Sequence, residues 1–423
     1  GLRLARRAPP AYRRQETDMY RVTRIIQSMM EPATPGQAPR AGGVKPPGPV
    51  VIWNLIRRCN LTCKHCYTTS ADIDFAGELS TAEAHAVLDD LAAFQVPALI
   101  LSGGEPLMRP DIFELSRRAR ELGLYTGLST NGTLITEANI DAIADVGYDY
   151  VGISIDGLEA THDAIRQRKG AFRESMHAVK LCKARGIKVG LRFTLTRENV
   201  EQLDDILGLI DAHDVDKFYL SHLNYGGRGR RHSKQDAWYR MTRDAMTRLF
   251  DHCRDELARG IHREYVTGNN DADGPFLLMW AREHFPERAE ALERQLIAWG
   301  GNASGEQIAN IDNLGNVHPD TFWWDHTLGN VRETPFSTIW RDTQDPLMVG
   351  FRQRPRPLKG RCAECRFLPI CNGNTRVRAW KVTGDPWEED PGCYLSNREI
   401  GVAEGAERRV GAPHAAIQAI EIP

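Results

Sequence analysis

From residue 50 to about residue 223, segments with the signals of β-strands alternate with segments long enough to be α-helices. The strand-like runs are residues 50–56, 98–102, 124–130, 150–155, 187–194 and 217–220. The helix-length segments between them are residues 81–94, 111–122, 136–146, 171–185 and 199–213. This α/β alternation predicts a parallel sheet with right-handed crossover connections. Such sheets carry their chemistry at the carboxyl ends of the strands, so the residues that follow each strand are the candidates for a functional site.

Three cysteines lie on the loop directly after the first of these strands. Cys59, Cys63 and Cys66 have the spacing C-x3-C-x2-C. Three soft thiolates on one short loop suit an iron–sulfur cluster. A cubane cluster has more irons than this loop has cysteines, so one iron stays open to hold a reactant. The alternatives are a zinc knuckle or three unrelated core thiols, but zinc sites close with four protein ligands and His65 is poorly placed to be the fourth.

A second group of cysteines lies near the carboxyl end of the chain. Cys362, Cys365, Cys371 and Cys393 have the spacing C-x2-C-x5-C-x21-C. Four thiolates close a metal site completely, so this centre is expected to take no substrate on a metal ion. An iron–sulfur cluster and a tetrahedral zinc ion both satisfy four cysteines. With seven of the nine cysteines in two groups, metal binding in a reducing cytoplasm is favoured over disulfide bonds.

Two further strands are followed by residues that suit a polar ligand. After the second strand, Gly103 and Gly104 let a ligand approach the backbone, and the carboxylate or the carbonyl of Glu105 can accept hydrogen bonds from an ammonium group. After the third strand, Asn131 lies in a Thr-Asn-Gly sequence, where a plain turn and a role beside a cofactor are both consistent.

The overall composition excludes other classes of protein. The 54 Lys and Arg residues balance the 56 Asp and Glu residues, so no global basic field recommends a nucleic acid partner. No apolar run reaches the ~18 residues of a membrane helix, and nothing resembles a secretory signal, so no membrane partner and a cytoplasmic location are expected. A chain of 423 residues has room for two or three domains.

The first cysteine loop and the Gly-Gly-Glu-Pro sequence after the second strand together resemble the radical S-adenosylmethionine (radical SAM) enzymes. The resemblance implies an incomplete (β/α)6 barrel of the TIM type, opened sideways to admit a large substrate. It implies that Cys59, Cys63 and Cys66 hold a [4Fe–4S] cluster whose open iron binds S-adenosyl-L-methionine. One electron then cleaves this cofactor to methionine and a 5′-deoxyadenosyl radical.

The same resemblance implies the contacts to S-adenosylmethionine. Gly103, Gly104 and Glu105 would receive the methionine amine, and Asn131 would lie near the cofactor. Ser154, at the end of the fourth strand, would hydrogen-bond the ribose, and Arg166 would pair with the methionine carboxylate. Both residue types suit these partners, a hydroxyl for a hydroxyl and a guanidinium fork for a carboxylate. No side chain is assigned a catalytic role.

The second cysteine group resembles the SPASM and twitch extensions behind radical SAM barrels, which favours an auxiliary [4Fe–4S] cluster over zinc. A full SPASM domain holds a second auxiliary cluster with further cysteines. This chain has Asp320 and Thr375 where two of them are expected, so one auxiliary cluster is predicted. A further cluster with unusual ligands at His318 or Asp320 stays open.

The expected domain organisation follows from these assignments. Residues 1–49 form an amino-terminal extension and linker, although a helical stretch is expected over residues 20–30. Residues 50–260 form the radical SAM barrel, residues 261–403 form the auxiliary cluster domain, and residues 404–423 form a tail.

Two other features remain open. The arginines of residues 225–232 could hold acidic side chains of a substrate or could belong to a solvated loop. Trp323 and Trp324 could wall a flat aromatic ligand or could pack in the core.

Longer strings resemble one family within the superfamily, the radical SAM proteins of haem d1 biosynthesis (the NirJ family). These strings are residues 53–59, 125–132, 220–225, 267–274 and 371–378. This resemblance implies a tetrapyrrole substrate, 12,18-didecarboxysirohaem, which loses propionate side chains, and an electron donor such as flavodoxin or ferredoxin. Alternatives are a sister enzyme of the alternative haem pathway, a peptide-modifying SPASM maturase and a scaffold with closed zinc sites. The short stretch before the first strand disfavours a maturase with a leader-binding domain.

Overall fold

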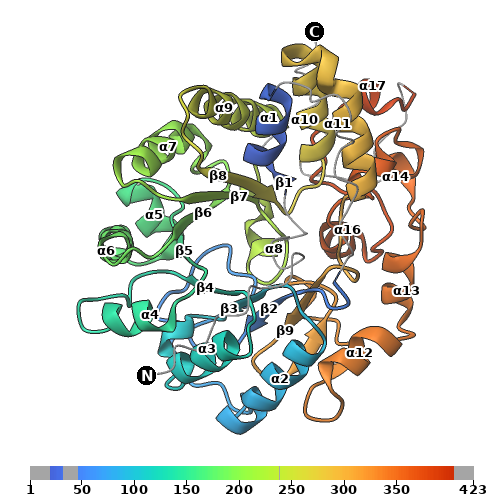
Figure 1. Cartoon of the computed structure of the whole chain (residues 1–423). Coiled ribbons are helices and arrows are strands. Elements are labelled where there is room, and N and C mark those ends of the chain that lie inside the picture. Colours follow the sequence, from blue (N-terminus) through green and yellow to red (C-terminus); the bar gives the residue numbers. More distant parts are fainter. Residues whose placement is uncertain (1–19, 32–45, 238, 404–423) are drawn as a thin grey trace.

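A computed structural model describes residues 20–31, 46–237 and 239–403 of the chain (Figure 1). The expected extension at residues 1–18, most of the expected linker and the expected tail lie outside the described residues. In the described part, one sheet of eleven strands has the order β1-β8-β7-β6-β5-β4-β3-β2-β9-β10-β11. The sheet is not a closed barrel, because β1 and β11 form two separate edges.

The predicted parallel α/β arrangement is confirmed. The strands from β2 to β8 pair in parallel with their neighbours, and β9 pairs in parallel with β2. The parallel strands are β2 (Val50–Asn54), β3 (Leu99–Ser102), β4 (Thr126–Thr130), β5 (Tyr150–Ser154), β6 (Val189–Leu195), β7 (Lys217–His222), β8 (Glu264–Gly268) and β9 (Ile308–Ile311).

Helices cover the outer side of this curved sheet, as Figure 1 shows. They are α2 (Thr81–Ala93), α3 (Ile112–Glu121), α4 (Ile140–Val146), α5 (Glu159–Arg166), α6 (Ala171–Ala184), α7 (Leu203–Ala212) and α9 (Tyr239–Ala258). Their apolar faces pack against the sheet, as with Leu88 and Leu91 of α2, which are fully buried. A capping box between Ser80 and Glu83 fixes where α2 begins.

The barrel sheet extends beyond residue 260, where the barrel was expected to end. The additional strand β8 pairs with β7, and the short strand β1 (Tyr20–Arg21) pairs antiparallel with β8. The expected helix near the amino terminus is α1 (Val22–Met30), which packs against α9 and β8 with Val22 and Ile26 fully buried. Residues 20–30 therefore complete the barrel at its β8 end.

The carboxyl-terminal third also joins the sheet, through β9. The antiparallel strands β10 (Asn316–His318) and β11 (Gly329–Asn330) continue it, and this third also contains several helices. These helices are α10 (Asp273–His284), α11 (Pro286–Trp299), α12 (Phe336–Asp342), α13 (Pro346–Arg352), α14 (Gly360–Glu364), α15 (Leu368–Cys371), α16 (Arg376–Thr383) and α17 (Asn397–Ile400). One continuous sheet thus joins the barrel to the carboxyl-terminal third, which carries the second cysteine group.

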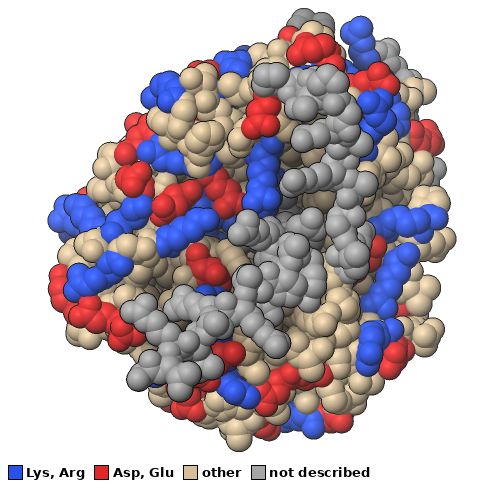
Figure 2. All heavy atoms as spheres, in the orientation of Figure 1, with Lys and Arg blue, Asp and Glu red and all other residues tan. Residues whose placement is uncertain are grey.

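The surface carries charge of both signs. On the face shown in Figure 2, Lys and Arg side chains are interspersed with Asp and Glu side chains. Every helix in the described residues is too short or too polar to cross a lipid bilayer.

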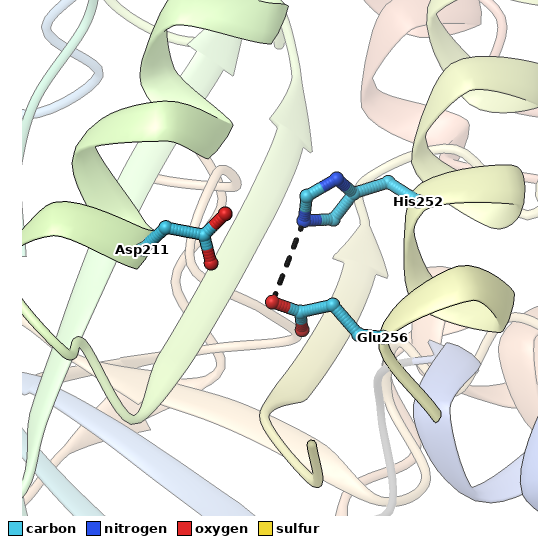
Figure 3. A group of neighbouring side chains, drawn as sticks. All are labelled: Asp211, His252 and Glu256. Carbon is cyan, nitrogen blue, oxygen red and sulfur yellow. Dashed lines mark ion pairs between the residues drawn. The ribbon is translucent and has the colours of Figure 1, made fainter. Parts of the chain in front are cut away.

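One compact group of polar side chains joins α7 and α9 on the outer side of the sheet. Asp211, His252 and Glu256 lie together, as Figure 3 shows. Arg263 forms ion pairs with both carboxylates, and the Tyr265 hydroxyl donates to Glu256 at 2.8 Å. Burial opposes ionisation of Glu256, but hydrogen bonds from His252 and Tyr265 and the charge of Arg263 hold its pKa at about 2. Because Arg263 already supplies the positive charge that a metal ion would otherwise bring, we interpret the group as a structural ion-pair network.

We expect Glu256→Gln to lower the free energy of unfolding by about 2 kcal/mol, because it leaves the Arg263 charge without its most buried partner. The urea midpoint of the anaerobic protein measures this effect. Glu290→Gln is the matched control, since Glu290 is 86% exposed and pairs only with Arg294 on its own helix. Equal midpoints for the two variants would contradict the structural role of Glu256.

Candidate functional site

The loop after β2 brings its three cysteines together at the carboxyl end of the parallel strands. Cys59 and Cys63 are buried, Cys66 is half-buried, and the three pack around Leu61. The Leu61 N–H donates to the Cys59 sulfur at 3.4 Å, and the Cys66 N–H donates to the Cys63 carbonyl at 3.3 Å. All three cysteines line one cavity of about 280 Å³.

Burial changes the pKa of two of these thiols. Burial raises the pKa of Cys59 to about 12, and the nearby Glu105 carboxylate adds to the effect. Burial also raises the pKa of Cys63, although Arg166 opposes this. Metal binding must therefore displace the protons of these thiols. Because the three thiols lie together at one cavity, the donor set fits an iron–sulfur cluster held by three thiolates.

Residues 226–229 pack against the cysteine loop and form hydrogen bonds with it. Arg228 donates from its backbone N–H to the Cys66 carbonyl at 2.9 Å and from Nε to the Cys63 carbonyl at 2.8 Å. A Cβ on Gly227 would lie 2.3 Å from the Tyr67 carbonyl oxygen, so this close approach requires glycine. The half-buried Arg228 guanidinium thus contacts the cysteine loop, whereas Arg230 and Arg231 are exposed, as a solvated loop would have them.

Gly103 and Gly104 also contact the cysteine loop. The Gly104 N–H donates to the Ile56 carbonyl at 2.6 Å. A Cβ on Gly104 would lie 2.2 Å from the Arg58 carbonyl oxygen, and one on Gly103 would lie 2.5 Å from the Ile56 carbonyl oxygen. Both glycines line the cavity, so the chain runs close to the cysteine loop on one side and to the cavity on the other.

The side chain of Glu105 is fully buried and bonded within the protein. It accepts hydrogen bonds from the Thr130 hydroxyl at 2.8 Å, the Asn131 N–H at 2.9 Å and the Leu107 N–H at 3.1 Å. Burial raises the pKa of Glu105 to about 7. The Glu105 carboxylate thus ties the ends of β3 and β4 together, whereas Gly103 and Gly104 line the cavity.

Asn131, Ser154 and Arg166 line the same cavity. The Asn131 side chain donates to the Asn60 side chain at 2.9 Å. Arg166 pairs with the buried Asp156 at 2.5 Å and donates to the Cys63 sulfur at 3.5 Å, while its Nε is buried without a hydrogen-bond partner among the residues that the structure describes. An unpartnered donor beside a cavity is suited to an anionic ligand.

Asp156, which lies just after β5, orients two cavity residues. It pairs with His65 at 2.9 Å as well as with Arg166. Burial opposes its ionisation, but Arg166 and His65 hold the pKa of Asp156 well below its ordinary range. Its position at the end of β5 is the signal that sequence reasoning could have used.

The cavity has a distinct charge and an aromatic wall. Arg166, Arg192 and Lys217 line it, and the lining contributed by described residues contains no Asp or Glu. Tyr67 and Phe322 also line it, with ring centroids 5.4 Å apart, and Trp324 lies 6.3 Å from Tyr67. Of the two tryptophans considered from the sequence, Trp323 is 1% exposed and belongs to the core, whereas Trp324 packs behind the wall at Tyr67.

The structure also brings the second cysteine group together. Cys362, Cys365, Cys371 and Cys393 line one small cavity of about 30 Å³, beside α14 and α15. Burial raises the pKa of Cys362 to about 11 and of Cys365 to about 12. Four half-buried cysteines around one cavity fit a metal centre closed by four thiolates.

The residues considered for a further cluster already have protein partners. His318 bonds through Nδ1 to the His326 carbonyl at 2.8 Å and through Nε2 to Asp312 at 3.3 Å. Asp320 accepts hydrogen bonds from the Ser304 hydroxyl at 2.6 Å and the Phe322 N–H at 2.8 Å. The Thr375 hydroxyl donates to the Asn269 carbonyl at 3.2 Å. These bonds favour one auxiliary centre.

Comparisons with known proteins agree with this site. The model of the radical SAM superfamily matches residues 53–210, which include the first cysteine loop and the strands from β3 to β6. The chain belongs to the radical SAM superfamily and is a radical SAM enzyme. Membership of this family implies S-adenosylmethionine and a [4Fe–4S] cluster, in accordance with the three-cysteine loop.

Among curated relatives, the pre-heme d1 synthase of Dinoroseobacter shibae is 52% identical over 92% of this chain and 96% of that protein. The resemblance to the haem d1 family is thereby confirmed. The Fe-coproporphyrin III synthase of Methanosarcina barkeri is 44% identical over 84% of this chain and 90% of that protein.

Solved structures show the same fold at low sequence identity. SuiB of Streptococcus suis bound to its precursor peptide SuiA has a TM-score of 0.66 at 18% identity, over 82% of this chain and 76% of that chain. Native anSMEcpe with bound AdoMet has a TM-score of 0.63 at 18% identity, over 83% of this chain and 95% of that chain. These likenesses concern the fold alone.

Proposed function

We propose that this radical SAM enzyme removes propionate side chains from 12,18-didecarboxysirohaem in haem d1 biosynthesis. The observation that carries the proposal is the cavity beside the three-cysteine loop, which is lined by three Lys and Arg residues and by no described carboxylate. A cavity of this charge suits a substrate with several carboxylates. The high identity to a pre-heme d1 synthase over nearly the full chain supports the same substrate class.

A second candidate is the oxidative side-chain chemistry of the alternative haem pathway. The identity to an Fe-coproporphyrin III synthase favours it, and both candidate substrates are carboxylated tetrapyrroles. A peptide substrate has weaker support. The PqqA peptide cyclase of Gluconobacter oxydans is only 29% identical over 85% of this chain.

In this proposal the side chains around the cavity bind and orient S-adenosylmethionine. The cluster on Cys59, Cys63 and Cys66, when bound, supplies the electron that cleaves this cofactor. The unpartnered Nε of Arg166 is available for the methionine carboxylate.

The other contacts come from the strand ends. The backbone at Gly103 and Gly104 accepts hydrogen bonds from the methionine amine, with Glu105 fixing its position, and Asn131 borders the same region. The Ser154 hydroxyl hydrogen-bonds the ribose. Tyr67 and Phe322 narrow the cavity mouth and keep water from the reacting atoms.

We further propose that Cys362, Cys365, Cys371 and Cys393 hold an auxiliary [4Fe–4S] cluster, for which four thiols around one cavity are suited. The barrel unit then covers residues 20–31 and 46–268, and the auxiliary unit begins after β8, because β8 belongs to the barrel sheet. Electrons would come from a flavodoxin or a ferredoxin.

The proposal is tested by anaerobic incubation of the enzyme with S-adenosylmethionine, dithionite and either 12,18-didecarboxysirohaem or Fe-coproporphyrin III. We expect 5′-deoxyadenosine and a mass loss corresponding to propionate removal with the first substrate. Conversion of 12,18-didecarboxysirohaem to Fe-coproporphyrin III, or turnover of Fe-coproporphyrin III alone, would assign the chain to the alternative haem pathway. Deoxyadenosine without change in either tetrapyrrole would contradict a tetrapyrrole substrate.

We expect Cys365→Ala to release deoxyadenosine but to form no finished product, because the cofactor site in the barrel is separate from this thiol. Chromatography of deoxyadenosine and mass spectrometry of the tetrapyrrole measure the two steps. Cys182→Ala is the matched control, since Cys182 is buried on α6 outside both cysteine groups. Equal loss of both products in Cys365→Ala would contradict separate roles for the two centres.

A further inference from the structure

The side chain of Arg192 occupies the interior of the barrel and has no assigned role. Arg192 lies on β6 between Leu191 and Phe193, whose side chains are fully buried. Because side chains alternate along a strand, Arg192 faces the opposite side, and it lines the cavity. Its register partner on β5 is Ser154, the residue proposed to bind the ribose.

Three neighbouring strands hold the Arg192 guanidinium in one orientation. A Cβ on Gly152 of β5 would lie 3.1 Å from the Arg192 Cδ, so glycine leaves room for the side chain to cross this strand. Beyond it, Arg192 donates to the Ser129 hydroxyl of β4 at 2.5 Å. On the other side, the Arg192 Cζ lies 5.3 Å from the ring centroid of Tyr219 on β7. A fixed guanidinium loses little conformational entropy when it binds a ligand.

Arg192 differs from the other cations of the cavity in its charge balance. Arg166 pairs with Asp156, and Lys217 lies 3.9 Å from Glu264. In the described part of the chain, Arg192 forms no ion pair, and it contacts the Ser129 hydroxyl and the Tyr219 ring. A half-buried cation without a counter-charge is costly unless a ligand supplies the charge.

We infer that Arg192 binds a carboxylate side chain of the substrate and thereby sets the orientation of the tetrapyrrole in the cavity. This inference rests on the proposed function. The planar guanidinium of Arg192 can donate two parallel hydrogen bonds to a carboxylate. Neutral side chains in the cavity cannot make this charged, two-point contact. The ligand class is a carboxylated side chain, acetate or propionate, on a flat macrocycle. Recognition through a charge predicts that affinity depends on the substrate's carboxylates.

The test measures binding without turnover. Cluster-loaded enzyme is titrated with Fe-coproporphyrin III, a tetracarboxylate, and with its tetramethyl ester, and the absorbance change gives each dissociation constant. We expect Arg192→Met to weaken binding of the acid by about 10- to 100-fold and to leave binding of the ester unchanged. Arg192→Lys, which keeps the charge, should recover part of the affinity, and Arg192→Gln should not.

Several controls separate this role from others. Arg248→Met replaces a surface arginine of α9 and should not change either dissociation constant. The spectral change of the reduced cluster on addition of S-adenosylmethionine should persist in Arg192→Met. The ratio of acid to ester affinity within each variant also corrects for any partial loss of folded protein.

Three outcomes would overturn the inference. An unchanged affinity ratio in Arg192→Met would show that Arg192 does not bind the carboxylate. Loss of the S-adenosylmethionine effect together with an unchanged ratio would assign Arg192 to the cofactor. Failure of the wild-type enzyme to bind Fe-coproporphyrin III, its ester and 12,18-didecarboxysirohaem would reject the proposed function itself. The inference would fall with it.

Discussion

Replacement of Cys59 by alanine is expected to abolish the release of 5′-deoxyadenosine. With one of three thiolates removed, the loop can no longer hold a cluster that presents an open iron. Loss of a mere hydrogen-bond partner of a metal ligand typically costs ~10- to 100-fold, so loss of the ligand itself should cost more. Chromatography of deoxyadenosine after anaerobic incubation with dithionite measures the rate, and iron and sulfide analysis measures cluster occupancy.

Cys253→Ala is the matched control for this prediction. Cys253 is a buried thiol on α9, outside both cysteine groups, so its replacement should leave deoxyadenosine release near that of the wild type. Substantial deoxyadenosine from Cys59→Ala would contradict the assignment of the three-cysteine loop. Zinc without sulfide in the wild-type protein would contradict it as well.

The second large effect is expected for Gly104→Ala, a change of one methyl group. The added Cβ would lie 2.2 Å from the Arg58 carbonyl oxygen and 2.5 Å from that of Arg57, and both are backbone atoms. Either the turn after β3 or the cysteine loop must move, and the hydrogen bond from Gly104 to Ile56 is lost with the movement. A displacement of about 1 Å at a reacting site can lower a rate by ~100-fold, and we expect a loss of that order in deoxyadenosine release.

The effect of Gly104→Ala should appear in cofactor binding rather than in global stability. Spectroscopy of the reduced cluster with added S-adenosylmethionine reports binding, and thermal unfolding reports stability. Gly208→Ala is the control, because a Cβ at Gly208 on α7 would meet no atom within 4 Å. Wild-type activity in Gly104→Ala would show that the contact between these two loops is not required.

Local sequence patterns were sufficient for the main features of the fold and for both cysteine groups. The six strands first expected are β2 to β7, because each is an apolar run bounded by helix-length segments. The cysteines could be grouped by spacing, since Cys59, Cys63 and Cys66 lie on one short loop and the other four lie in one segment near the carboxyl end. The strand β8 has no such signal, because its five residues depend on pairing with β7 and β1.

Roles that depend on distant contacts could not be deduced from the sequence. Arg228 lies in a basic loop that is far from the cysteines in sequence, and only the fold brings its guanidinium to their carbonyls. The Glu105 carboxylate accepts a hydrogen bond from Thr130 of β4, whereas Gly103 and Gly104 line the cavity. In the sequence, Arg192 is a charged residue in a strand, like many surface residues. Only the fold shows that its side chain passes Gly152 and bonds to Ser129.

The pairing of β9 with β2 has a consequence for how the two halves of this enzyme depend on each other. Because β9 covers β2 along Val50–Trp53, removal of the carboxyl-terminal third would leave the backbone donors and acceptors of β2 exposed at a sheet edge. Uncovered parallel edges attract other strands, so an isolated barrel should aggregate. The strand left bare would be the one that leads directly into the first cysteine, and assembly of the iron site should therefore require the whole polypeptide.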